Sequence, residues 1–232
     1  GYYSTVTGLD PIPASSEEVM VARDICLARE TNSPVHIAHI STKGAVQLVR
    51  DAKKQGVPVT CEATPHHFSL TDEAITSFST ATKVHPPLRS KEDVQAIKDG
   101  LQDGTIDVIA TDHAPHAAEE KDVEYDYAPF GISGLETAVG LINTELIEPG
   151  ILSWAEAVAK LTTNPASILG LDEGKLEAGA VADLSVIDPE YKWEVKPEEF
   201  VSKGKNTPFA EQELKGQNIM TIVNGEVVFS SI

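Results

Sequence analysis

Seven histidines, all before residue 120, are the first residues in this chain that could do chemistry. They are His36, His39, His66, His67, His85, His113 and His116. Imidazole binds borderline cations such as zinc and exchanges protons near neutral pH. A lone histidine is usually a surface or core residue. This concentration, beside the ends of predicted strands, favours a metal-site hypothesis.

The segment I-D-V-I-A-T-D-H-A-P-H, residues 106–116, adds a carboxylate to this set. Its even-numbered residues, from Ile106 to Asp112, share one face of a strand because side chains alternate. The pattern puts Asp112 at the carboxyl end of a buried strand, where barrel enzymes keep their chemistry. The alternative is an aspartate that only caps a core strand.

His36 and His39 lie three residues apart and cannot face the same side of a strand over 35–40. We prefer His39 as a ligand because it is nearer the carboxyl end and precedes a Ser-Thr pair that can start a helix. His36 then packs or supports a ligand. In C-E-A-T-P-H-H-F, Glu62 and His66 or His67 are either further ligands or structural residues.

In V-H-P-P-L-R, two prolines stiffen the backbone between His85 and Arg89. This arrangement suits substrate positioning, with a surface turn as the alternative. His39 and Asp112 together offer nitrogen and oxygen to a hard or borderline cation, and a carboxylate beside a metal can shuttle a proton. Catalytic zinc normally takes three protein ligands, so this set is short.

The elements that must position these residues alternate between strand and helix. Strands are expected over 35–40, 57–61 and 106–111, and helices over 17–32, 42–56, 91–103, 135–146 and 154–161, with a short helix from 71. Residues 1–15 are predicted to be loop, and residues 192–216 are predicted to be loop with broken strands. The alternation predicts an α/β fold with a parallel sheet and helices outside.

The pattern changes after about residue 171. Two glycine turns precede a β-rich run, and Asn224-Gly225 stands between two apolar strands near the chain end, a strong hairpin signal. We therefore divide the chain into an α/β body over residues 1–172 and a small β module over residues 173–232.

Composition limits the partners of this 232-residue chain. A net charge of -18 argues against nucleic acid and anionic membranes, and no apolar run reaches membrane-spanning length. Cys26 and Cys61, the two cysteines, indicate a reducing cytoplasm without a disulfide framework. The first ten residues have no secretory signal pattern and no initiator Met, so we expect a fragment or a processed piece.

Five segments together resemble the bacterial class I dihydroorotases of the amidohydrolase superfamily. They are V-H-I-A-H-I-S-T-K, V-T-C-E-A-T-P-H-H-F, K-V-H-P-P-L-R-S, I-A-T-D-H-A-P-H and A-P-F-G-I-S-G-L-E-T. The run G-K-L-E-A-G-A-V-A-D-L-S-V-I-D resembles the carboxyl-terminal signature of the superfamily. The match covers almost the whole chain in order, and H-P-P-L-R and T-D-H-A-P-H are its most specific parts.

The resemblance implies part of a distorted (β/α)8 TIM-type barrel over residues 1–172 and a small β-sandwich over residues 173–232. It implies reversible zinc-dependent hydrolysis of L-dihydroorotate to N-carbamoyl-L-aspartate in pyrimidine biosynthesis, with one or two zinc ions. By motif position, His39 and Asp112 are zinc ligands, and Asp112 is also the catalytic acid/base. The substrate contacts implied are His85, His116, Phe130 and Gly131. Many relatives have Asn where this chain has His85.

The first metal motif of the family, an H-x-H followed by an arginine, is absent, as are its bridging carboxylate and third histidine. We therefore expect the carboxyl-terminal part of a longer enzyme, inactive and not self-sufficient by itself. Two alternatives stay open: another cyclic amidohydrolase, such as an allantoinase or hydantoinase, and a non-catalytic subunit of an aspartate transcarbamoylase complex. The resemblance also leaves room for a homodimer.

Overall fold

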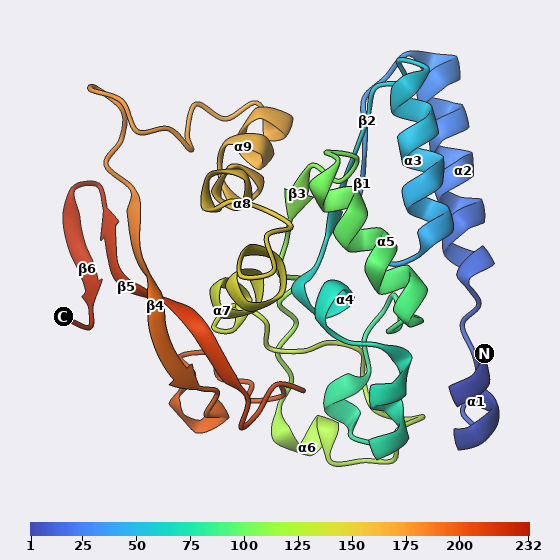
Figure 1. The fold of residues 1–232 in the computed structure, drawn as a ribbon. Helices are drawn as coiled ribbons and strands as arrows, with labels where there is room; N and C mark the ends of the chain where they lie inside the picture. The colour runs from blue at the N-terminus through green and yellow to red at the C-terminus, as the bar shows by residue number, and fades with distance from the viewer.

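The computed structural model describes residues 1–232 and contains two separate three-stranded sheets (Figure 1). The first is parallel, in the order β1-β2-β3, and consists of β1 (Val35–Ile37), β2 (Val59–Ala63) and β3 (Val108–Ile109). The second is antiparallel, in the order β4-β5-β6, and consists of β4 (Leu184–Glu194), β5 (Glu213–Val223) and β6 (Glu226–Ser230). The predicted mixed α/β class is confirmed.

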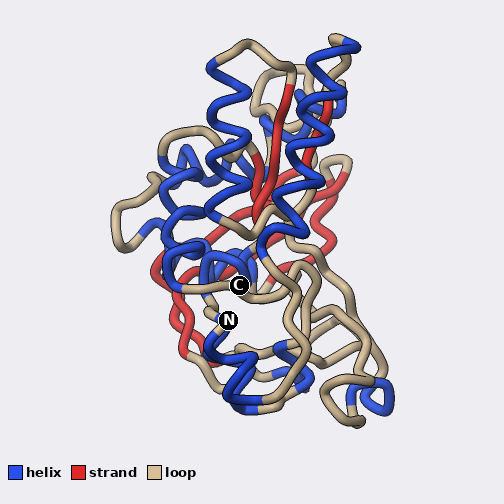
Figure 2. The backbone as a smooth tube through the Cα atoms, turned by 90° about the vertical axis from the view of Figure 1, so that its right-hand side faces the viewer, coloured by secondary structure: helices blue, strands red, loops and turns tan.

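The helices separate and cover these sheets. The α-helices are α1 (Tyr2–Thr7), α2 (Ala14–Thr31), α3 (Lys43–Lys54), α4 (Pro65–Ser69), α5 (Lys91–Gln102), α6 (Ala118–Lys121), α7 (Ala138–Ile142), α8 (Trp154–Leu161) and α9 (Thr163–Leu169). Short 3-10 turns are η1 (Asp72–Ser77), η2 (Thr80–Thr82) and η4 (Pro197–Glu199), and η3 (Asn143–Ile147) is a π turn. Helices α2, α3 and α5 flank the parallel sheet, whereas α7, α8 and α9 lie between the two sheets (Figure 1). Seen from the side of α2 and α3, helices lie in front of the strands (Figure 2).

The core lies where α3 covers the parallel sheet. Ala45, Val46 and Val49 on α3 are fully buried and belong to the same cluster as Ile37 and Cys61 on the strands. Residues of β2 alternate between buried and half-buried, so one face of this strand meets the helices and the other carries polar side chains. The polar face is the one available for a site.

Three predicted strand ranges are corrected. The strand expected over 35–40 stops at Ile37 because His39 has a φ of 37°, which extended backbone cannot include. The strand expected over 106–111 is only Val108–Ile109, and Asp112 again has a positive φ of 46°. The strand expected over 57–61 is displaced to Val59–Ala63.

The loop predicted over residues 1–15 is wrong in part, whereas the broken strands expected within 192–216 are present. Residues 2–7 form α1, which ends at Gly8 in the left-handed conformation. Within 192–216, β4 continues through Glu194 and β5 begins at Glu213. Both segments lack regular apolar spacing, and strand pairing rather than local pattern holds β4 and β5 together.

The β module contains the predicted hairpin, with Asn224 and Gly225 at φ 51° and 81° in the turn that joins β5 to β6. It is a single sheet here, so a sandwich and a domain boundary at 172 stay predictions. Phe209 and Leu214 are buried in the same cluster as the helices of the body. None of the helices combines the length and apolar character needed to span a bilayer.

Candidate functional site

His39 and Asp112 lie just beyond the carboxyl ends of β1 and β3, on either side of β2 in the sheet order. Both have left-handed backbone conformations, with φ of 37° and 46°. For a residue other than glycine this conformation costs on the order of 1 kcal/mol or more, and it persists where the surrounding structure imposes it. Such residues gather at active sites, and these two are the ones that the sequence marked as ligands.

The electrostatics link the two residues. Burial raises the pKa of the Asp112 carboxyl above its usual value, the proximity of His39 opposes this shift, and Glu62 adds to it. The Nδ1 atom of His39 is buried without a hydrogen-bond partner. An unpaired imidazole nitrogen and a carboxylate within electrostatic range fit two ligands of a borderline cation.

The chain does not supply a complete metal site. No group of three or more His, Cys, Asp or Glu side chains is arranged so that it could hold one ion. His39 and Asp112 fit a partial ligand set only.

Glu62 and His36 form a pair on the polar face of the strands. The Nε2 of His36 lies 3.1 Å from a Glu62 carboxylate oxygen, and its Nδ1 lies 2.8 Å from the Thr60 hydroxyl. Burial raises the pKa of the Glu62 carboxyl, but hydrogen bonds and charges from His36 and His39 together outweigh it, so the net shift is downward. Glu62 is engaged with His36, which matches the supporting role left open for that histidine.

His66 and His67 are both buried on α4. The two ring nitrogens of His67 lie 2.8 Å from the Thr64 hydroxyl and 2.9 Å from the Pro86 carbonyl, so neither is free for a metal. Burial lowers the pKa of His67 to about 4 and that of His66 well below its usual range. His67 is a structural residue that supports the segment carrying His85.

His85 shares a cavity with His39. The cavity has a volume of about 610 Å³, and its polar lining residues include Glu17, His36, His39, His85 and Arg89. The exposed His85 ring makes an edge-on contact with Phe130, with ring centroids 5.3 Å apart. The structure therefore places a candidate ligand and a candidate substrate contact around one space.

His116, Phe130 and Gly131 form a second group. The His116 Nε2 lies 2.8 Å from the Phe130 carbonyl oxygen. Gly131 has a φ of 130°, and a Cβ there would lie 2.6 Å from the Ala114 Cβ, so only glycine fits. The Gly131 N–H donates to the Lys83 carbonyl at 2.9 Å, and its carbonyl accepts from the Asn206 amide at 3.0 Å. Internal bonds thus fix the backbone expected to contact substrate.

Two lysines that the sequence did not single out hold the loop containing these residues. The Lys83 Nζ donates to the carbonyls of Tyr125 and Asp126 and lies 4.9 Å from the Phe130 ring centroid. The buried Lys121 donates to the carbonyls of Thr80 and Pro129. No periodicity marks such contacts, because they join loops distant in sequence.

His113, in the same motif as Asp112, has a structural role. Its Nδ1 accepts from the backbone amides of Gly134 and Leu135 at 3.1 and 3.3 Å. Its Nε2 therefore carries the proton and donates to the Ser202 hydroxyl at 2.9 Å. The ring joins the site loop to the segment before β5.

The model of the amidohydrolase family matches residues 7–228, and the chain belongs to this family. It is 62% identical to the dihydroorotase of Pelotomaculum thermopropionicum over 228 residues, which are 98% of this chain and 53% of that protein. It is 55% identical to the dihydroorotase of Syntrophus aciditrophicus, over 99% of this chain and 54% of that protein. The chain spans about half the length of the curated relatives it matches.

Solved structures of hydantoinases are similar in fold. The L-hydantoinase of Arthrobacter aurescens superposes with a TM-score of 0.89 at 29% identity, covering 94% of this chain and 49% of that one. The D-hydantoinase of a Thermus species superposes with a TM-score of 0.86 at 27% identity, with the same coverage. The body of the chain thus has the α/β architecture of cyclic amidohydrolases.

Proposed function

We propose that the protein carrying this chain is a dihydroorotase, which hydrolyses L-dihydroorotate reversibly to N-carbamoyl-L-aspartate. The observation that carries the proposal is the pair His39 and Asp112, each held in a left-handed conformation beyond a parallel strand and each in its family motif. Relatives named dihydroorotase at 52–62% identity support this choice of substrate.

His39 and Asp112 would hold zinc together with ligands that this chain does not supply. Zinc, when bound in such a site, polarises a carbonyl group and acidifies water. Asp112 takes a proton from the water molecule that adds to the ring carbonyl. As the ring C–N bond breaks, Asp112 returns the proton to the departing nitrogen, so one water is consumed and the carboxylate is regenerated. A carboxyl whose pKa is raised by burial suits this shuttle.

Of the proposed substrate contacts, His85 lines the cavity that His39 also lines, and its ring touches that of Phe130. His85 replaces the Asn of many relatives, and both side chains donate a hydrogen bond, so contact with the substrate is retained with altered geometry. By its motif position His116 contacts the substrate carboxylate or ring, and for this its ring must exchange its partners in the chain, the Phe130 carbonyl at 2.8 Å and Glu120 at 3.3 Å, for the substrate. It lies beside the Phe130-Gly131 backbone that Lys83 and Asn206 fix. A cytoplasmic location, a homodimer and association with aspartate transcarbamoylase complete the proposal.

Substitution of Asp112 tests the proposal. In the full protein, Asp112→Asn should lower kcat on dihydroorotate by about 10²–10⁴-fold, because the amide cannot carry the proton. Asp122→Asn, in an exposed position of the same loop, is the matched control and should leave kcat unchanged. Near-normal turnover by Asp112→Asn, with a normal melting temperature, would overturn the assignment.

A hydantoinase or allantoinase activity is the second candidate, because the similar solved structures are hydantoinases. Comparison of kcat/KM on dihydroorotate, allantoin and hydantoin separates the two. The highest value on dihydroorotate supports our proposal, and the highest value on either other substrate replaces it. Absence of both turnover and bound zinc would favour the non-catalytic subunit.

A further inference from the structure

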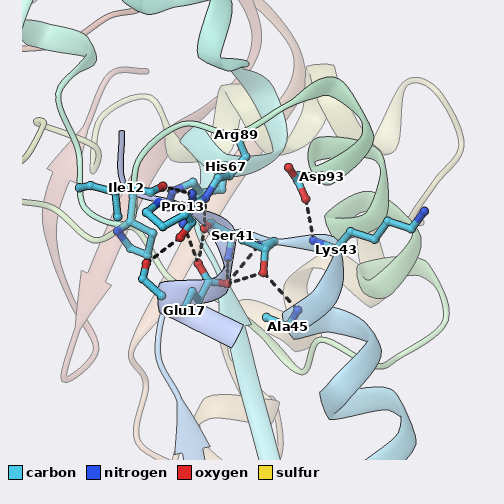
Figure 3. A network of polar contacts seen from close by, with 12 residues as sticks. Ile12, Pro13, Glu17, Ser41, Lys43, Ala45, His67, Arg89 and Asp93 are labelled. Carbon is cyan, nitrogen blue, oxygen red and sulfur yellow. Dashed lines mark hydrogen bonds and ion pairs between the residues drawn. The ribbon is translucent and has the colours of Figure 1, made fainter. Parts of the chain in front are cut away.

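Glu17 and Arg89 form a buried ion pair that contacts the segment following His39. Glu17 comes from α2, and Arg89 comes from the segment that begins at His85 (Figure 3). Their side chains are only 11% and 8% exposed, and they meet at Ser41, two residues after His39. Buried charges of this kind require several partners, so their contacts are informative.

Arg89 joins three separate segments. Its Nε donates to the Ser41 hydroxyl at 3.0 Å, and its Nη1 donates to the Ile12 carbonyl at 2.7 Å. Its Nη2 makes no hydrogen bond and lies 3.5 Å from a Glu17 carboxylate oxygen, an ion-pair contact. The planar guanidinium presents its donors in a rigid fork, so the two hydrogen bonds fix Ser41 relative to Ile12, and the charge of Glu17 is held beside them.

Glu17 holds the start of α3. One carboxylate oxygen accepts from the backbone amides of Ser41 and Thr42 at 2.8 and 3.0 Å, and the other accepts from the Ser41 hydroxyl. The Thr42 side chain in turn accepts from the Ala45 amide as the N-cap. The first amides of a helix lack internal partners and favour negative charge, so the carboxylate fits this position.

These contacts bracket His39. Before His39 in the chain lies strand β1. After it, the Ile40 amide donates to the Glu62 carbonyl at 2.9 Å. The next two amides, of Ser41 and Thr42, donate to the Glu17 carboxylate. A left-handed histidine persists only when its flanks leave no other conformation. Ser41 and Thr42 provide the flank after His39.

The same pair also fixes the His85 segment. Arg89 anchors one end of this segment, and Pro86 and Pro87 limit its backbone freedom. The Pro86 carbonyl lies 2.9 Å from the His67 Nε2, the ring drawn beside Arg89 in Figure 3. His39 and His85 line one cavity, and Glu17 and Arg89 line it with them.

We propose that Glu17 and Arg89 are positioning residues, which hold His39 in its ligand position and fix its spacing from His85. The choice of dihydroorotate as the assay substrate rests on the proposed function, whereas the contacts of Glu17 and Arg89 do not depend on it. A pair with only a structural role would change the stability of the protein and leave the metal affinity and kcat unchanged.

The chain offers a matched control at the opposite ends of the strands. Lys53 and Asp107 form an ion pair at 2.7 Å, with side chains 25% and 22% exposed. Asp107 also accepts from the Cys61 amide at 2.9 Å, so this carboxylate too holds backbone. It precedes β3, whereas the candidate site follows it.

The test compares Arg89→Lys, Glu17→Gln and the control Asp107→Asn in the full protein. We measure zinc affinity by competition with a chelator, kcat and KM on dihydroorotate, and the melting temperature. Arg89→Lys should lower zinc affinity and kcat by about 10- to 100-fold, because an ammonium cannot make the two hydrogen bonds in one rigid fork. Glu17→Gln should lose less, since its amide oxygen still accepts from Ser41 and Thr42. Asp107→Asn should lower the melting temperature but should change the zinc affinity and kcat by less than about twofold.

Wild-type zinc affinity and kcat in folded Arg89→Lys would overturn the proposal, as would equal losses in Asp107→Asn. If Arg89→Lys does not fold, Ser41→Ala, which removes only the hydroxyl between the pair, decides by the same criteria. A wild-type protein that binds zinc but does not turn over dihydroorotate would refute the proposed function. The zinc affinities of the variants would then still decide whether Glu17 and Arg89 position His39. A wild-type protein that binds no zinc would overturn the positioning role.

Discussion

At the scale of single residues, the chain keeps several polar side chains buried in defined protonation states. His67 bridges the Thr64 hydroxyl and the Pro86 carbonyl as a neutral ring, and burial lowers its pKa to about 4. Burial also lowers the pKa of the neighbouring His66 well below its usual range. The half-buried His113 keeps one tautomer because backbone amides occupy its Nδ1. His67 holds the segment of His85 in place through neutral hydrogen bonds, which acid would disrupt.

The first prediction concerns acid stability. Because His67 binds a proton more weakly in the folded state than in the unfolded state, stability should fall as the pH drops from about 6.5 to about 4 and level off below. The shift corresponds to roughly 3 kcal/mol, and the depressed pKa of His66 acts in the same direction. Urea unfolding at several pH values from 7 to 4 measures it. His67→Gln should show a smaller pH dependence, and an unchanged dependence would contradict the assignment.

At the scale of elements, helix starts rather than long strands position the site. The parallel strands are two to five residues long, and the candidate ligands His39 and Asp112 follow β1 and β3 rather than lie within them. Thr42 caps α3, and Ser90 and Asp93 form a capping box on α5. Asp93 also accepts from the Lys43 amide at 2.8 Å, so it joins the starts of α3 and α5 (Figure 3).

The second prediction compares two capping boxes. Asp93→Ala should lower the free energy of unfolding by about 2 kcal/mol, because it removes the capping-box carboxylate that accepts from Ser90 and the acceptor of the Lys43 amide. Glu156→Ala removes the corresponding acid of α8, which joins no second helix, and should cost about 1 kcal/mol. Chemical unfolding gives both values. Equal losses would show that the contact between α5 and α3 adds no stability.

At the scale of the molecule, one hydrophobic cluster of 30 residues runs from α2 to β5. Phe200, Phe209 and Leu214 belong to it, although they lie in the carboxyl-terminal part that sequence pattern assigns to a β module. Helix α7 packs against β5, which joins the antiparallel sheet to the body. By contrast, every residue of β6 is exposed.

The third prediction follows from this shared core. Phe209 is 1% exposed, and Phe209→Ala should lower the free energy of unfolding by about 3–5 kcal/mol while the transition stays single. Phe229→Ala on β6, where the ring is 47% exposed, is the control and should cost less than about 1 kcal/mol. Calorimetry and denaturant unfolding measure both. A separate early transition in Phe209→Ala would indicate that the sheet and the body are independent units.

The sequence by itself determined the elements and motifs that depend on residues close together in the chain. The strand-helix alternation, the helix start at Thr42, the turn at Asn224-Gly225 and the motif residues His39 and Asp112 all follow from local spacing and residue type. The structure confirms these elements, and the ligand roles of the two motif residues stay predictions.

Only the tertiary structure decided where the strands end and what holds their ends. Glu17 and Ser41 are 24 residues apart, and Arg89 and Ile12 are 77 apart, so no local pattern reveals that they meet. The left-handed backbone at His39 and Asp112 is likewise imposed by distant contacts against the intrinsic preference of both residues. Local sequence marks candidate ligands, but burial and long-range hydrogen bonds set their geometry.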